Sequence, residues 1–66
     1  MGIQEIRKLF KIGTGAHLRS YPETTMIVDR IIVVDSKTRI ECVWMNNGNL
    51  NRESFSPESL YSYNQN

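Results

Sequence analysis

Residues 25–55 hold most of the β-branched residues of the chain, arranged as apolar runs separated by two turn signals at hairpin spacing. The first run, residues 26–35, reads MIVDRIIVVD, and the second, residues 39–45, reads RIECVWM. In the second run Ile40 and Trp44 fall on one face of a strand, because successive side chains alternate. Valine and isoleucine have restricted χ1 angles that favour strands. The pattern therefore predicts a three-stranded antiparallel meander.

The pair Asn47-Gly48 predicts the turn between the second and third strands. A two-residue type I′ turn needs positive φ at both central positions, which Asn and Gly tolerate best. This turn fixes the register of the strand pairs: Met45 with Leu50, Trp44 with Asn51, Cys42 with Glu53 and Ile40 with Phe55. Phe55 then lies on the same face as Ile40. The polar residues 36–38 are expected to connect the first two strands.

Shorter elements are predicted on both sides of the meander. Residues 3–10 place apolar side chains at helical spacing, which predicts one or two turns of helix, or an arm. Pro22 cannot donate to a ladder, and Ser56 with Pro57 is typical of a helix start. The remaining predicted segments are a strand at 16–20, a loop at 21–24, a 3₁₀ turn at 56–59, a strand at 61–63 and a frayed tail at 64–66.

Five short strands with a one-turn helix before the last predict one mainly all-β domain over residues 1–66. Two architectures fit this plan: a small five-stranded SH3-like barrel, or a strongly curved antiparallel sheet with a short N-terminal helix. Under unbroken alternation, residues 26–34 are apolar on both faces, and the second face needs a cover. The N-terminal helix or a second subunit is expected to supply it, and we favour a homodimer.

Composition limits the compartments and partners that can be expected for this chain. The single Cys42 cannot form an intrachain disulfide, which is typical of a reducing cytoplasm. The longest aliphatic run, residues 31–34, is far too short to span a membrane. The net charge of +1 gives no general argument for nucleic acid, although residues 1–20 carry four basic side chains against one acidic side chain. We therefore expect a cytoplasmic protein without a membrane partner.

A set of residues in this order resembles the YodC-like family of small bacterial and phage proteins. The residues are Phe10, Gly13, Leu18-Arg19-Ser20, Met26-Ile27-Val28, Cys42-Val43-Trp44-Met45, Phe55 and Leu60. The resemblance covers about residues 10–60 and implies a small β fold without an established activity. Two positions depart from the family pattern. Tyr21-Pro22-Glu23 stands where Gly-Gly-Pro is usual, and Met45 stands where an aromatic residue is usual.

Residues that carry chemistry are sparse. His17 and Cys42 are each the only residue of their type, and Cys42 alternates with apolar neighbours, which predicts a buried thiol rather than a nucleophile. Two such residues cannot make a zinc site, and Gly13-Thr14-Gly15 lacks the helix entry of a phosphate-binding loop. We therefore expect a protein that is not an enzyme and that has no metal or cofactor.

Aromatic and arginine side chains suggest a binding surface. Trp44 is either a core residue or a partly exposed platform. Of Tyr61 and Tyr63, one is expected to point inward and the other outward. The candidate ligand-binding residues are Arg19, Tyr21, Trp44, Arg52, Tyr61 and Tyr63. Of these, Arg19, Tyr21 and Arg52 are expected to join the exposed tyrosine at one rim. Such surfaces bind extended peptides or stack nucleotide bases.

Three hypotheses of function follow from the sequence. The first is a non-enzymatic β-barrel binding module that acts through a protein partner or by self-assembly. The second is a protein that binds a small molecule or nucleotide at a subunit interface, such as a phage anti-defence protein that sequesters a signal. The third is an accessory protein that binds nucleic acid through its basic N-terminal arm.

Overall fold

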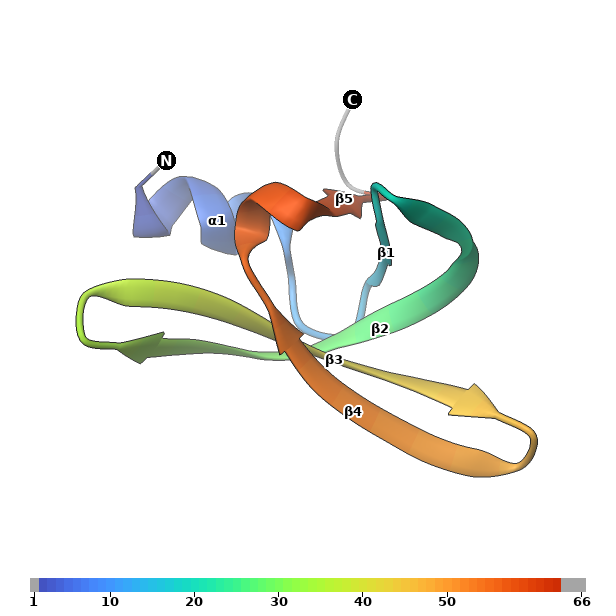
Figure 1. The fold of residues 1–66 in the computed structure, drawn as a ribbon. Coiled ribbons are helices and arrows are strands. Elements are labelled where there is room, and N and C mark those ends of the chain that lie inside the picture. The colour runs from blue at the N-terminus through green and yellow to red at the C-terminus, as the bar shows by residue number, and fades with distance from the viewer. Residues whose placement is uncertain (1, 64–66) are drawn as a thin grey trace.

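A computed structural model describes residues 2–63 and shows one five-stranded antiparallel sheet with the strand order β4-β3-β2-β1-β5 (Figure 1). The elements are α1 (Ile3–Leu9), β1 (Gly15–Leu18), β2 (Tyr21–Val34), β3 (Lys37–Asn46), β4 (Asn49–Phe55), the 3₁₀ helix η1 (Pro57–Ser59) and β5 (Leu60–Ser62). The predicted tail at 64–66 lies outside the described residues.

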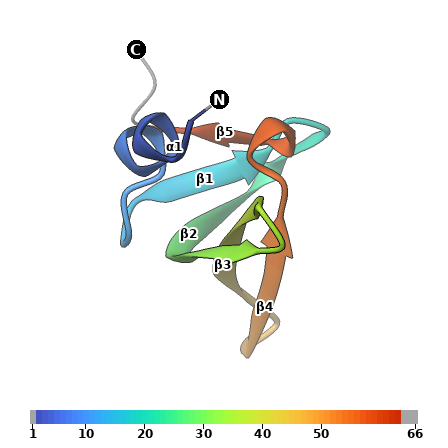
Figure 2. The same cartoon turned by 90° about the vertical axis from the view of Figure 1, so that its left-hand side faces the viewer.

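The sheet is strongly curved and open. β4 and β5 stand at the two ends of the strand order and do not pair with each other. In two perpendicular views α1, η1 and β5 lie on one side of the β2–β3–β4 layer, and β1 joins that layer to β5 (Figures 1 and 2). Of the two predicted architectures, the structure has the curved antiparallel sheet with an N-terminal helix.

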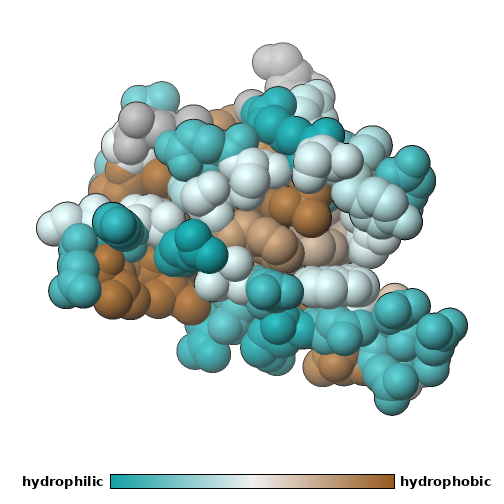
Figure 3. All heavy atoms as spheres, in the orientation of Figure 1, coloured by the Kyte–Doolittle hydropathy of each residue, from teal (hydrophilic) through white to brown (hydrophobic). Residues whose placement is uncertain are grey.

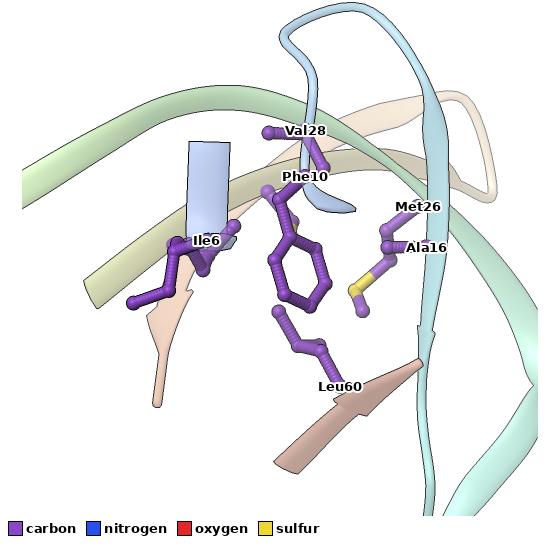
Figure 4. Close-up of a cluster of buried hydrophobic side chains, with 8 residues drawn as sticks. Ile6, Phe10, Ala16, Met26, Val28 and Leu60 are labelled. Carbon is purple, nitrogen blue, oxygen red and sulfur yellow. The ribbon is translucent and has the colours of Figure 1, made fainter. Parts of the chain in front are cut away.

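The core lies between the concave face of the sheet and the elements that cover it. Its buried apolar residues are Ile6, Phe10, Ala16, Met26, Val28, Ile40, Cys42 and Leu60. Phe10, just after α1, lies between Val28 and Leu60 at the centre of the cluster (Figure 4). The hydroxyl of Ser62 donates to the carbonyl of Leu9, which ties β5 to the end of α1. The predicted helix is confirmed, and packing rather than length stabilises it.

The hairpin between β3 and β4 confirms the predicted turn and register. Asn47 has φ 52° and Gly48 has φ 80°, as a type I′ turn requires. The pairs run from Asn46 with Asn49 to Ile40 with Phe55 without a break. The concave face therefore receives alternate residues of β4, including Phe55.

The turn between β2 and β3 comes earlier than the sequence predicts. Val34 pairs with Lys37, so Asp35 and Ser36 form a two-residue turn with φ angles of 51° and 65°. The expected connection at 36–38 is wrong at Lys37 and Thr38, which belong to β3. A type I′ turn matches the twist of its strands, and Asp tolerates the left-handed region better than most residues.

The expected loop at residues 21–24 is also wrong, because these residues begin β2. β1 and β2 meet around a two-residue turn, with Leu18 opposite Tyr21. The register then shifts, and Ala16 pairs with Met26. Several residues of β2, including Pro22, therefore lie opposite the single residue His17. Pro22 is tolerated there because irregular strand ends do not require every N–H group.

A bulge at Asp29 overturns the unbroken alternation expected for β2. Val28 pairs with Cys42 and Arg30 pairs with Glu41, so Asp29 is the extra residue. Beyond the bulge the faces exchange. Ile31 was expected on the other face of the sheet from Val28. Instead it lies on the same concave face as Val28 and packs against the core.

The two tyrosines near the C-terminal end lie on the same face, so the expected inward and outward pair is wrong. Tyr61 and Tyr63 are 36% and 49% exposed, whereas Leu60 and Ser62 are fully buried. The last strand begins at Leu60 and ends at Ser62, one residue before the expected range on each side.

The 3₁₀ turn is confirmed, with a different hydrogen bond from the one expected. The side chain of Ser56 forms no capping bond. Instead the hydroxyl of Ser59 donates to the carbonyl oxygen of Ser56 at 2.8 Å.

The convex face of the sheet keeps exposed apolar side chains. Met45 and Leu50 pair across the β3–β4 hairpin and are 63% and 60% exposed, and Ile27 is 43% exposed. The buried residues of α1 and its C-cap, Ile6 and Phe10, belong to the core on the concave side, so α1 does not supply the cover expected for these residues. The homodimer stays a prediction.

Packing of Tyr63 against Gly15 predicts an effect on stability. A Cβ at Gly15 would lie 2.5 Å from Cδ2 of Tyr63, a severe overlap. We expect Gly15→Ala to lower the free energy of unfolding by about 1–3 kcal/mol, the range for overpacking. Chemical denaturation measures this value.

The control for this prediction is the same substitution in a Tyr63→Ala background. There the overlapping ring is absent, so Gly15→Ala is expected to cost little. An equal loss in both backgrounds would show that the ring is not the cause.

Candidate functional site

An apolar groove opens on the concave side of the sheet, where the sheet does not close. It has a volume of about 240 Å³. The lining residues are Leu18, Tyr21, Thr24, Met26, Trp44, Glu53 and Phe55. Figure 3 shows apolar surface in the middle of this face, between the upper elements and β4. We call this site the β4 groove.

Four strands contribute residues to the lining of the β4 groove. Leu18 and Tyr21 flank the turn between β1 and β2, and Met26 lies further along β2. Trp44 comes from β3 and Phe55 from β4, with their ring centroids 6.4 Å apart. Both rings pack against the core and are only partly buried. Trp44 is therefore both a core residue and a wall of the groove.

Among residues 2–63, Glu53 is the only charged residue that lines the β4 groove. It pairs with Cys42, so it stands on the concave face of the edge strand. Its side chain is exposed, and it forms no ion pair among the described residues. The groove thus combines three aromatic rings with one unpaired carboxylate.

The backbone of β4 beside the groove is an unpaired edge. Asn46 and Asn49 flank a two-residue turn, where such pairs exchange hydrogen bonds. Because the bonded pairs alternate, Leu50 and Arg52 direct their N–H and C=O groups away from β3. Further along, a side-chain nitrogen of Arg39 donates to the carbonyl of Ser54 at 2.9 Å. The open part of the edge is therefore the half nearest the hairpin turn.

Three of the predicted ligand-binding residues form a stack with His17 on the convex side of β1 and β5. The ring of His17 lies 5.2 Å from each of Tyr61 and Tyr63, measured between ring centroids. The guanidinium carbon of Arg19 lies 5.5 Å from the centroid of Tyr61. Since neighbours already flank the ring of His17, the stack offers no open platform there. His17 Nδ1 is buried and has no hydrogen-bond partner among the described residues.

Arg52 lies apart from the other predicted residues, in an ion-pair network on the convex face. Its Nη1 donates to Asp29 at the bulge and, at 2.9 Å, to Glu41. Arg30 Nε lies 2.7 Å from the same Glu41 oxygen. The hydrogen bond from Arg30, and next the one from Arg52, hold the pKa of the Glu41 carboxyl below its ordinary value. Asp29 and Glu41 raise the pKa of Arg52.

Cys42 is a buried structural thiol, as predicted. It is fully inaccessible, and burial, with a smaller effect of the Glu41 charge, raises its pKa to about 11. His17 alternates with the inward Ala16 and Leu18, so it lies on the other face of the sheet. Among residues 2–63 no three His, Cys, Asp or Glu side chains are placed to hold a metal ion. No helix in that range is long and apolar enough to cross a membrane.

A larger hollow of about 330 Å³ lies between α1, the start of β3 and η1. Its lining residues are Ile6, Ser36, Lys37, Thr38, Arg39, Ser56, Pro57 and Glu58. This lining is mostly polar, and Arg39 is already bonded to Ser54. Binding sites for ligands are usually apolar with a few polar groups, which favours the β4 groove instead.

The six predicted site residues fall in three places. Tyr21 and Trp44 line the β4 groove. Arg19, Tyr61 and Tyr63 belong to the stack with His17, and Arg52 belongs to the convex ion-pair network. The single rim expected from the sequence does not form.

Sequence reasoning missed Glu53 as a groove residue, and it assigned Phe55 only to the core face. A signal for Glu53 was present, because the predicted register pairs it with Cys42 on the concave face. Leu18, Thr24 and Met26 were missed because the turn at Arg19 and Ser20 was not expected, and this turn pairs Leu18 with Tyr21 at the groove.

Comparisons of the chain with models of protein families, with curated proteins and with solved structures found no significant match. The resemblance to the YodC-like family therefore stays a prediction from the sequence.

The lowered pKa of Glu41 predicts a pH-dependent contribution to stability. A carboxyl with a lowered folded-state pKa stabilises the fold above its unfolded value, here about 4.5, and this effect is lost as pH falls through the folded value. Glu41→Gln should therefore lower the free energy of unfolding most at pH 6–7. The difference from the wild type should shrink as the pH falls below about 4.5.

Denaturant titrations at several pH values measure this difference, and Glu23→Gln is the control. Glu23 is exposed on β2 and has no ion pair among the described residues. If the difference in free energy of unfolding between wild type and Glu41→Gln stays constant from pH 7 to pH 3, the prediction is wrong.

Proposed function

We propose that the chain is a non-enzymatic binding module that holds an extended segment of a partner protein in the β4 groove. The observation that carries this proposal is an apolar groove of about 240 Å³ beside an unpaired edge strand. An extended peptide can add a strand to such an edge, while a nearby pocket selects one of its side chains.

The lining of the groove supports a protein ligand. Tyr21 is 57% exposed and Trp44 is partly exposed, and aromatic residues of this kind dominate the binding energy of protein interfaces. Met26 and Leu18 add an apolar base that is already formed in the free chain. Little ordering is therefore needed when a ligand binds.

The open edge of β4 suits a different protein better than a second copy of the chain. Full antiparallel pairing of two β4 strands would centre on Arg52 and would need the carbonyl of Ser54, which already accepts from Arg39. A foreign segment can pair with the open half of β4 alone, so we favour a partner protein over self-assembly at this edge.

The nucleotide hypothesis has less support at this site. Its expected cations, Arg19 and Arg52, do not line the groove, and Arg52 is already neutralised by Asp29 and Glu41. The charge that the groove contains is the carboxylate of Glu53, which repels phosphate. The basic residues of α1, Arg7 and Lys8, are exposed on another element and take no part in the groove.

Selection from a random peptide display library tests the proposal. We expect the immobilised chain to enrich peptides that bind wild type and lose affinity at least about tenfold for Tyr21→Ala, as expected for a truncated aromatic anchor. Trp44 is the only tryptophan, so its fluorescence should change when an enriched peptide binds.

Tyr61→Ala is the matched control, since it also removes a partly exposed tyrosine but from the convex stack. It should bind the enriched peptides with wild-type affinity. Peptides that lose binding with Tyr61→Ala and keep it with Tyr21→Ala would place the binding surface elsewhere and overturn the proposal.

A further inference from the structure

We infer that the β4 groove selects the cationic side chain of arginine from the segment that it binds. This inference rests on the proposed function and names the chemistry of its ligand. It follows from the joint presence of three aromatic rings, those of Tyr21, Trp44 and Phe55, and one carboxylate, that of Glu53.

The aromatic rings attract a cation through the negative potential of their faces. This attraction is stronger where water is partly excluded, and arginine engages aromatic faces more often than lysine. A planar guanidinium can stack on one ring while its aliphatic stem lies on Leu18 and Met26. A wholly apolar ligand would satisfy the rings but would leave Glu53 beside it without a partner.

The charges around the groove favour this selection. Within the part of the chain that the structure describes, Glu53 is the groove's only charged lining residue, and it forms no ion pair there. The nearest basic residues in sequence have other contacts. Arg52 bonds to Asp29 and Glu41, and Arg19 lies over Tyr61. A guanidinium can offer two parallel N–H donors to the free carboxylate.

A host peptide with one variable position tests the inference. The probe is acetyl-Thr-Val-Thr-X-Thr-Val-Thr-amide, where X is arginine, citrulline or norleucine. Citrulline has nearly the shape of arginine without its charge, and norleucine is an apolar chain. Binding is measured by Trp44 fluorescence and by NMR shifts of the groove residues, with wild type, Glu53→Gln and the control Glu58→Gln.

We expect the arginine peptide to bind wild type about threefold to tenfold more tightly than the citrulline peptide, in line with the usual strength of cation–π and exposed ion-pair contacts. Glu53→Gln should reduce the ratio of the two affinities. Glu58 is exposed on η1, so Glu58→Gln should leave this ratio unchanged. Binding of the arginine peptide should weaken as salt rises.

The outcomes separate the inference from the proposed function. If norleucine binds as tightly as arginine, or if Glu53→Gln leaves the ratio unchanged, the cationic selection is wrong while peptide binding in the groove stands. If none of the three peptides perturbs Trp44 or the groove residues, the inference is overturned together with the proposed function.

Discussion

The fold depends on bending one long strand so that a small sheet can bury its concave face. Val28 lies at the bend, with its carbonyl accepting from the N–H of Gly13 and its N–H donating to the carbonyl of Thr14, while it pairs with Cys42 in β3. The bulge at the next residue, Asp29, increases the local twist and exchanges the faces beyond it. This bend lets Phe10, from a segment too short to be stable alone, fill the centre of the core.

The same bend leaves one side of the sheet open, and the candidate site follows from that opening. A closed barrel would pair β4 and would cover Trp44 and Phe55 with a neighbouring strand. In the open sheet these rings line the groove together with Tyr21, and Glu53 stands beside them on the edge strand. The aromatic wall, the unpaired carboxylate and the free backbone therefore share one structural cause.

Local sequence signals predicted the parts of the fold that local chemistry determines. The Asn47-Gly48 turn set the β3–β4 register, and the alternation around Cys42 placed that thiol in the core. The bulge at Asp29 has no such signal, because the apolar residues before Asp29 and after Arg30 suit either face of a strand, and only pairing with β3 reveals it. The groove needed the turn between β1 and β2, where Pro22 suggested a loop. The predicted ligand-binding residues therefore lie in three separate places.

Binding of a segment beside the groove needs the open edge of β4, and amide hydrogen exchange measured residue by residue shows whether that edge is open. The N–H groups of Asn51 and Glu53 face β3, whereas those of Leu50 and Arg52 face the edge. Exchange should therefore alternate along β4, fast at Leu50 and Arg52 and slow at Asn51 and Glu53, because a hydrogen bond within the sheet protects an amide. Equal protection at all four amides in the free chain would mean that another strand covers the edge and that β4 is not open to a partner segment.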